Sequence, residues 1–199
     1  MGYSSDREFT DYIHNKLAVP LIYENLSWFP QEINKKISVN VDIANAVDKF
    51  LIDMVKKKII TVQERFREYR YHTYNDFTIR YEREFNSHEE RKKSEYFKLD
   101  CDYFVYGIVN SSKFHKEYAT GFVKYVVIDV KKLKSLFDND QIIIDKNLNS
   151  LKCVIKNDCL YCPVNYNHDR SSSFIPIDVK MLIMLFPNEN LILSQKGFI

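Results

Sequence analysis

The stretch from residue 46 to residue 67 decides the fold of this chain, and it reads AVDKFLIDMVKKKIITVQERFR. Two β-favouring apolar runs, 47–55 and 59–67, flank a charged turn, so we expect two successive strands joined by a hairpin. Asp48 interrupts the first run, and Gln63-Glu64-Arg65 interrupts the second. Polar groups within such runs cost burial energy, which indicates a role such as holding a metal ion or a phosphate.

The elements on either side of this stretch follow from capping signals and hydrophobic periodicity. A helix should begin near Asp6, kink at Pro20 and end at Pro30, and 31–45 reads as a loop. We expect further helices at about 88–100, 130–137 and 178–186, and strands at 77–82, 103–109, 124–128 and 141–145. A hairpin should turn at Asn157-Asp158.

Length and composition fit one globular domain over 1–199, with a core at about 6–129 and an extension at about 130–199. The formal net charge is only +2, so a nucleic-acid partner would need a local basic patch. The sequence has no signal-peptide pattern and no apolar run of membrane-spanning length. We therefore expect a cytoplasmic protein without a membrane partner.

The order helix, three strands, helix, strand resembles the core of the restriction-endonuclease-like PD-(D/E)XK superfamily, whose signature is an Asp on one strand and (D/E)-x-K on the next. The Mrr-type branch, with Gln in place of the second acid, is closest in motif. Val47-Asp48 fits its first step, and Val62-Gln63-Glu64-Arg65 fits its second, with Arg65 at the lysine position. The resemblance covers roughly Asp6 to Asp129 and implies an α/β (α+β) fold with a mixed sheet. The residues after this region predict a C-terminal β-hairpin and helix.

The resemblance implies a nuclease of restriction or phage type that uses Mg²⁺ or Mn²⁺. Asp48 would supply a carboxylate oxygen and Gln63 a carbonyl oxygen to the metal, while Arg65 would stabilise the phosphate. In the alternative arrangement Glu64 replaces Gln63 as ligand, because neighbouring residues of a strand face opposite ways. The substrate we expect is double-stranded DNA, and cleavage of both strands suggests a homodimer.

Arginine at the lysine position leaves three alternatives open. Arg65 cannot act as a general base, although it can act electrostatically. The missing lysine could have moved to another element, for instance to Lys98, or the site could bind without cutting. Glu64 and Arg65 could instead be edge-strand charges paired with Lys49 or Asp76.

Two further acids are weaker candidates. Asp76 opens the third expected strand, where it could reach the site, but Asn75-Asp76 is also common turn chemistry. Glu24 lies on the first helix, where members of the superfamily often carry an acid near the metal.

The segment from 65 to 83 interleaves arginines with aromatic residues. Arginine suits bidentate phosphate contact, and aromatic rings suit stacking on bases. The predicted nucleic-acid face comprises Arg67, Arg70, Arg80, Arg83 and Tyr69. Acidic residues in the same segment could instead convert it into a network of surface ion pairs.

Four cysteines in a cytoplasmic setting favour reduced thiols over metal ligands. Zinc is an alternative for Cys153, Cys159, Cys162 and His168, but their spacing matches known zinc sites poorly.

Besides the nuclease, two other functions are compatible with the sequence. One is a catalytically degenerate module on the same fold that binds nucleic acid or protein. The other is a partner domain that uses the apolar run 181–186 for contact, although such runs are more often core.

Overall fold

The computed structural model describes residues 3–32, 45–83 and 93–199. The chain forms two compact units, each built from separate parts of the sequence. The first unit comprises 1–74, 100–128 and 193–199, and the second comprises 75–99 and 129–192. Both contain helices and strands, so the mixed α+β class expected from the sequence is confirmed.

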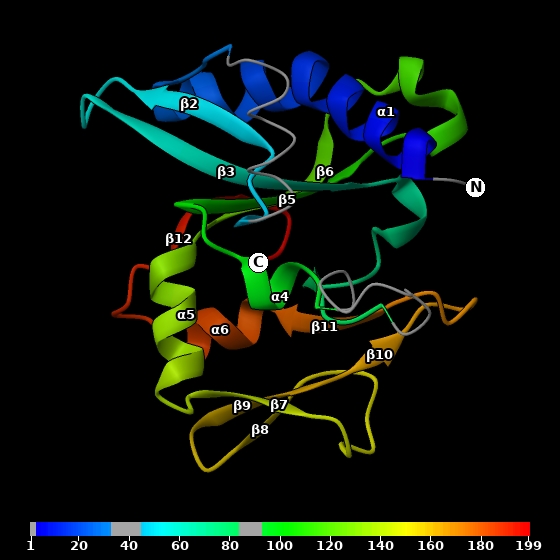
Figure 1. The fold of residues 1–199 in the computed structure, drawn as a ribbon, viewed down its shortest axis with the longest axis vertical. Coiled ribbons are helices and arrows are strands. Elements are labelled where there is room, and N and C mark those ends of the chain that lie inside the picture. The colour runs from blue at the N-terminus through cyan, green and yellow to red at the C-terminus, as the bar shows by residue number, and fades with distance from the viewer. Residues whose placement is uncertain (1–2, 33–44, 84–92) are drawn as a thin grey trace. The chain divides into compact units, whose positions relative to one another are not determined.

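The first unit is built on a six-stranded sheet in the order β1-β2-β3-β5-β6-β12 (Figure 1). Strands β2 and β3 are antiparallel, whereas β3 and β5 are parallel, so the sheet is mixed. Its strands are β1 (Trp28–Pro30), β2 (Lys49–Asp53), β3 (Lys58–Arg67), β5 (Tyr103–Val109), β6 (Phe122–Asp129) and β12 (Ile192–Lys196). Its helical segments are α1 (Tyr3–Ile13), η1 (His14–Tyr23), η2 (Glu24–Leu26), η3 (Tyr69–Tyr71) and η4 (Lys113–Tyr118).

The hairpin of β2 and β3 confirms the pairing predicted from the first quoted stretch, with Lys49 opposite Val62. Its turn is closed by the buried carboxylate of Asp53, which accepts the backbone N–H groups of Val55 and Lys56 at 3.0 and 2.8 Å. The carboxylate also accepts the indole N–H of Trp28 at 3.2 Å. A single acidic side chain therefore fixes this end of the hairpin.

The helical layer of α1 and η1 covers one face of this sheet (Figure 1). Its apolar side chains Ile13, Leu17 and Ile22 pack against residues of β3, including Val62 and Phe66. Regular α-helical hydrogen bonding cannot run through Pro20, which lacks an N–H group, and the chain is π-helical from His14 to Tyr23.

The second unit contains two three-stranded sheets, in the orders β10-β11-β4 and β7-β9-β8. Its strands are β4 (Asp76–Arg80), β7 (Ile142–Asp145), β8 (Val154–Lys156), β9 (Cys159–Pro163), β10 (Asn165–Tyr166) and β11 (Ser173–Asp178). Its helices are α4 (Glu95–Lys98), α5 (Val130–Asp138) and α6 (Val179–Leu185). Asp129 and Asp178 cap α5 and α6 by accepting backbone N–H groups in the first turn, as their sequence positions suggest.

Three expectations differ from the structure. The third expected strand forms β4, but it pairs with β11 of the second unit, and the neighbour of β3 is β5. The restriction-endonuclease-like strand order is therefore not shown. Trp28–Pro30, expected to end the first helix, is a strand paired with β2. The predicted helix at 88–100 is described only from 93 onward, where α4 is a single turn, and most of the loop at 31–45 also lies outside the described residues.

Among the helices that the structure describes, none is long and apolar enough to cross a membrane.

Candidate functional site

The most unusual feature of the first unit is a buried carboxylate in the middle of its sheet. Glu64 lies on β3 and is only 4% exposed. Its Oε1 atom lies 2.7 Å from Nδ1 of His14 and also accepts the hydroxyl hydrogen bond of Tyr23. Both partners lie on the π-helical segment η1, so two positions of this segment converge on one carboxylate oxygen.

The alternation of side chains along β3 explains this arrangement. Val62, Glu64 and Phe66 share one face of the strand, and the two apolar residues belong to the core beneath the helical layer. Glu64 is thus a polar residue at a core position. Burial of a carboxyl group is unfavourable without hydrogen bonds, and His14 and Tyr23 supply them.

Only one oxygen of Glu64 is satisfied in this way. Oε2 is buried and has no hydrogen-bond partner among the described residues. An unsatisfied buried acceptor costs about 1–3 kcal/mol, so such an atom in a native protein calls for an explanation such as an ion or a water molecule.

The hydroxyl of Tyr23 is affected by both its burial and the acids around it. Its pKa is raised well above the usual tyrosine value, first by burial and then by the charge and hydrogen bond of Glu64. The charge of Asp48 raises it further. Two acidic side chains therefore act on one buried hydroxyl.

Asp48 lies just before β2 and is fixed to the neighbouring strand. Its Oδ2 accepts the backbone N–H of Glu64 at 2.8 Å, and its own N–H donates to the carbonyl of Val62 at 2.9 Å. The chain enters this position through Ala46, whose φ of +52° lies in the left-handed region and costs a non-glycine residue about 1–2 kcal/mol. The carboxylate of Asp48 thus accepts a hydrogen bond from β3 that a backbone carbonyl of a paired strand would otherwise accept.

Gln63 and Arg65 lie on the opposite face of β3 from Glu64, as strand alternation requires. Gln63 is buried, and its carbonyl oxygen Oε1 has no hydrogen-bond partner among the described residues. Arg65 is half-buried. The structure thus brings Asp48 into contact with the backbone of Glu64, but it assigns the side chains of Gln63 and Glu64 to different faces.

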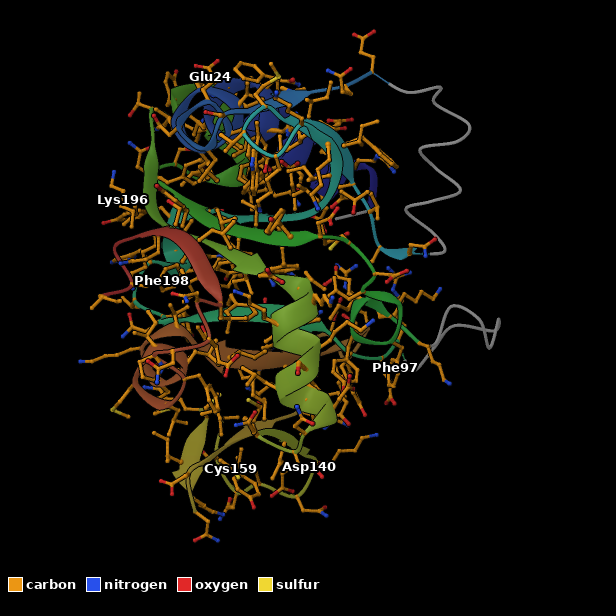
Figure 2. The ribbon with its side chains drawn as sticks, turned by 90° about the vertical axis from the view of Figure 1, so that its left-hand side faces the viewer. Glu24, Phe97, Asp140, Cys159, Lys196 and Phe198 are labelled. Carbon is orange, nitrogen blue, oxygen red and sulfur yellow. The ribbon has the colours of Figure 1, made fainter. Side chains whose placement is uncertain are left out.

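The remaining predicted acids and the predicted lysine lie elsewhere in the chain. Asp76 opens β4 in the second unit, opposite Asp178 of β11, and Lys98 ends α4 in the same unit. Glu24 begins η2 in the first unit and is exposed (Figure 2). Lys49, suggested as an ion-pair partner of Glu64 or Arg65, instead lies 2.8 Å from a carboxylate oxygen of Asp11 on α1.

The predicted nucleic-acid face is divided between the two units. Arg67 and Arg70 lie in the first unit. Both guanidinium groups stack on the ring of Tyr71, with their Cζ atoms 5.1 and 5.0 Å from the ring centroid. Arg70 also pairs with Glu68 at 2.7 Å, and Tyr69 stacks on His72 with ring centroids 4.2 Å apart.

Arg80 and Arg83 belong to the second unit. Arg80 lies 3.7 Å from Glu95 of α4, so its charge is already compensated within the unit. The ion-pair interpretation of the segment therefore has direct support at Arg70 and Arg80.

The sequence interpretation missed His14 and Tyr23. His14 directly follows Ile13, and Tyr23 directly follows Ile22, so both lie beside the apolar stripe of the helical layer. A polar side chain in such a position is usually a core residue whose hydrogen bonds are satisfied. The available signal was Glu64 itself, because a carboxylate at an apolar-facing strand position requires donors on the element packed above it.

The set proposed for zinc is not assembled. Cys159 and Cys162 point to opposite faces of β9, and His168 is exposed. Within the described ranges no group of three or more His, Cys, Asp or Glu side chains is arranged to hold a metal ion. All four cysteines have free thiols.

Comparisons with protein-family models, curated proteins and solved structures gave no match to this chain.

Proposed function

We propose that this chain is a metal-dependent phosphodiesterase that acts on DNA. The observation that carries the proposal is the placement of two acids beside each other: the carboxylate of Asp48 accepts the backbone N–H of Glu64. Besides burial, the charges of both acids raise the pKa of Tyr23. The unsatisfied buried oxygen of Glu64 adds an acceptor without a donor. A cation would satisfy this excess of acceptors.

The donor set suits Mg²⁺ or Mn²⁺. Mg²⁺ is usually held by one or two carboxylates together with waters and substrate phosphates, so a larger cluster of protein ligands is not required. Asp48 would be one ligand, and Glu64 or Gln63 the second. When bound, such an ion lowers the pKa of a coordinated water and neutralises charge on a phosphate.

The other residues of the site have roles that their own chemistry allows. Arg65 shares its face of β3 with Gln63, so in the arrangement with Gln63 as ligand it would bind a phosphate oxygen, because guanidinium stays charged and offers several donors. His14 and Tyr23 would orient the Glu64 carboxylate through its Oε1 atom. Arg67 at the end of β3, with Tyr69 and Arg70 just after it, would extend the contact along the same nucleic acid.

A second candidate function is a binding module that has lost the catalytic chemistry. It is favoured by the arginine at position 65 and by the engagement of Glu64 Oε1 with two donors of the protein. Such a module would bind nucleic acid with strong salt dependence but without a requirement for metal.

A cleavage assay with a matched pair of variants tests the proposal. The purified protein is incubated with plasmid, linear duplex, single-stranded DNA and RNA, in Mg²⁺, in Mn²⁺ and in EDTA. Asp48→Asn keeps an acceptor for the Glu64 N–H but removes the charge, so we expect full folding and loss of cleavage. Asp53→Asn is the control, because Asp53 also accepts backbone N–H groups but lies at the opposite end of β2.

Metal-dependent cleavage that survives in Asp53→Asn and disappears in Asp48→Asn would support the enzyme. Binding that persists in EDTA, with no cleavage of any substrate, would support the module and overturn the enzyme. Thermal melting of each variant shows whether a lost activity reflects unfolding.

A further inference from the structure

Two thiols face each other in the second unit. Cys153 directly precedes β8, and Cys162 lies on β9. Their Sγ atoms are 3.4 Å apart, and the residues are 5% and 0% exposed. Figure 2 labels Cys159, which begins β9 directly after the turn of the same hairpin.

The strand register explains why these two residues meet. Val154 pairs with Tyr161 and Ile155 with Leu160, so one step outward places Cys153 opposite Cys162. Directly opposed residues of antiparallel strands have Cα atoms about 4.5–5.5 Å apart, within the range that a disulfide spans. The Sγ atoms need to approach by roughly 1.4 Å to reach a bond of about 2.0 Å, which side-chain rotation can supply.

We propose that Cys153 and Cys162 are a site of oxidative modification, at which a peroxide converts the two thiols into a disulfide. The thiolate of one cysteine attacks an oxygen of hydrogen peroxide and the O–O bond breaks. The departing hydroxide takes up the proton that the thiol lost, so a sulfenic acid and one water are formed. The second thiol then attacks the sulfenic sulfur, forms the S–S bond and releases a second water. Two thiols are oxidised while one peroxide is reduced.

The exposure of the two thiols indicates their roles. Their Sγ atoms share one hydrogen bond at 3.4 Å. Cys153 is 5% exposed and Cys162 is 0% exposed, so Cys153 is the thiol that meets the peroxide, and Cys162 is the one that closes the bond. The pKa of Cys153, which the hydrogen bond with Cys162 lowers, agrees with this order.

The other two cysteines are poorly placed to compete. Cys159 faces away from Cys162 on β9, and its thiol lies 3.4 Å from the carbonyl of Asn157. Cys101 belongs to the first unit, and burial raises the pKa of its thiol to about 12. We therefore expect peroxide to link Cys153 with Cys162 and not to form another pairing of the four cysteines.

Closure of the bond changes how the hairpin is held. In the reduced protein the Cys153 thiol donates to the carbonyl of Pro176 on β11 at 3.1 Å. A disulfide removes this donor and replaces it with a covalent link between β8 and β9. The two sheets of the second unit therefore lose one hydrogen bond between them when the hairpin gains its cross-link.

Mass spectrometry and thiol titration of the full chain test the proposal. The reduced protein is treated with hydrogen peroxide, quenched with catalase, alkylated and digested under non-reducing conditions. We expect free thiols to fall from the four of the reduced chain to two, with a linked peptide pair containing Cys153 and Cys162. Dithiothreitol should restore all four.

Two variants separate this outcome from general oxidation. Cys159→Ser should retain the loss of two thiols, whereas Cys162→Ser should lose none to a disulfide and should accumulate sulfinic acid at Cys153. Thiols that stay fully reduced in the wild type, a disulfide that includes Cys159 or Cys101, or a metal ion bound by the pair in the purified protein would each overturn the proposal.

Discussion

Nδ1 of His14 lies 2.7 Å from Oε1 of Glu64, although the residues are 50 positions apart in the chain. The contact joins the helical layer to the sheet through a polar group in an otherwise apolar core. Tyr23 donates to the same oxygen, so the carboxylate is held from two positions of one helical segment. We therefore expect the three side chains to act as one unit in the stability of the first unit.

Tyr23→Phe should lower the free energy of unfolding by about 1–3 kcal/mol, because a buried acceptor loses a donor while the ring keeps its packing. Urea unfolding measures the change. Tyr125→Phe is the control: its hydroxyl contacts Ser194 at 3.2 Å from a partly buried position, so its loss should cost only about 0.5–1.5 kcal/mol. Equal effects in the two variants would contradict a special role for Tyr23.

The raised pKa of Tyr23 predicts a loss of stability at high pH. Burial and the charge of Glu64 favour the neutral phenol in the folded protein, whereas an unfolded tyrosine ionises at about pH 10. The stabilisation is thus fully present below about pH 10 and is lost as the pH rises from there toward the folded pKa.

The measurement is urea unfolding of wild type and Tyr23→Phe between pH 8 and 11. The other tyrosines are common to both proteins, so the difference between the two isolates Tyr23. We expect this difference to shrink above about pH 10. A constant difference across the range would show that the phenol ionises equally in both states.

Local signals in the sequence were sufficient for several elements. Asp129 begins a helix because a short acceptor followed by a helical apolar pattern is a local cap. Asn157 and Asp158 turn the β8–β9 hairpin because both adopt φ near +50° to +60°, which these two residue types tolerate. Each of these features involves residues within a few positions of one another.

Features that depend on distant residues could not be read in the same way. The β-favouring side chains Thr78, Ile79 and Tyr81 predict a strand, but they do not specify whether that strand pairs with β3 or with β11. The candidate site was only half predictable for the same reason. Asp48 and Glu64 visibly interrupt apolar runs in the sequence. The role of His14 depends on its contact with Glu64, which forms only when the helical segment packs on the sheet.

Gly107 offers a test of packing between β5 and its neighbours. A Cβ at this position would lie 2.5 and 2.7 Å from ring atoms of Phe122 and 3.2 Å from the ring of Phe66. Both rings are buried in the core, so Gly107→Ala should destabilise the protein by about 1–3 kcal/mol. Phe122→Leu in the same chain should recover part of this loss by making room.

Gly121→Ala is the matched control, since nothing lies within 4 Å of its Cβ position. We expect a change between neutral and about 1 kcal/mol of stabilisation, because alanine restricts the unfolded chain. Thermal melts of both variants give the comparison, and similar melting temperatures would contradict the close packing at Gly107.

Metal binding measured in the absence of substrate distinguishes Glu64 from Gln63 as the second metal ligand. Mn²⁺ titrations followed by electron paramagnetic resonance report affinity directly, and Asp48→Asn should weaken it in either arrangement. If Glu64 is the ligand, Glu64→Gln should weaken binding at least tenfold, since it removes a charge, while Gln63→Leu should leave it unchanged. If Gln63 is the ligand, Gln63→Glu should strengthen binding and Glu64→Gln should have little effect. Gln63 Oε1 and Glu64 Oε2 are both buried without a hydrogen-bond partner among the described residues, so this feature does not separate them. The charges of Glu64 and Asp48 both act on Tyr23, which makes the first result the expected one.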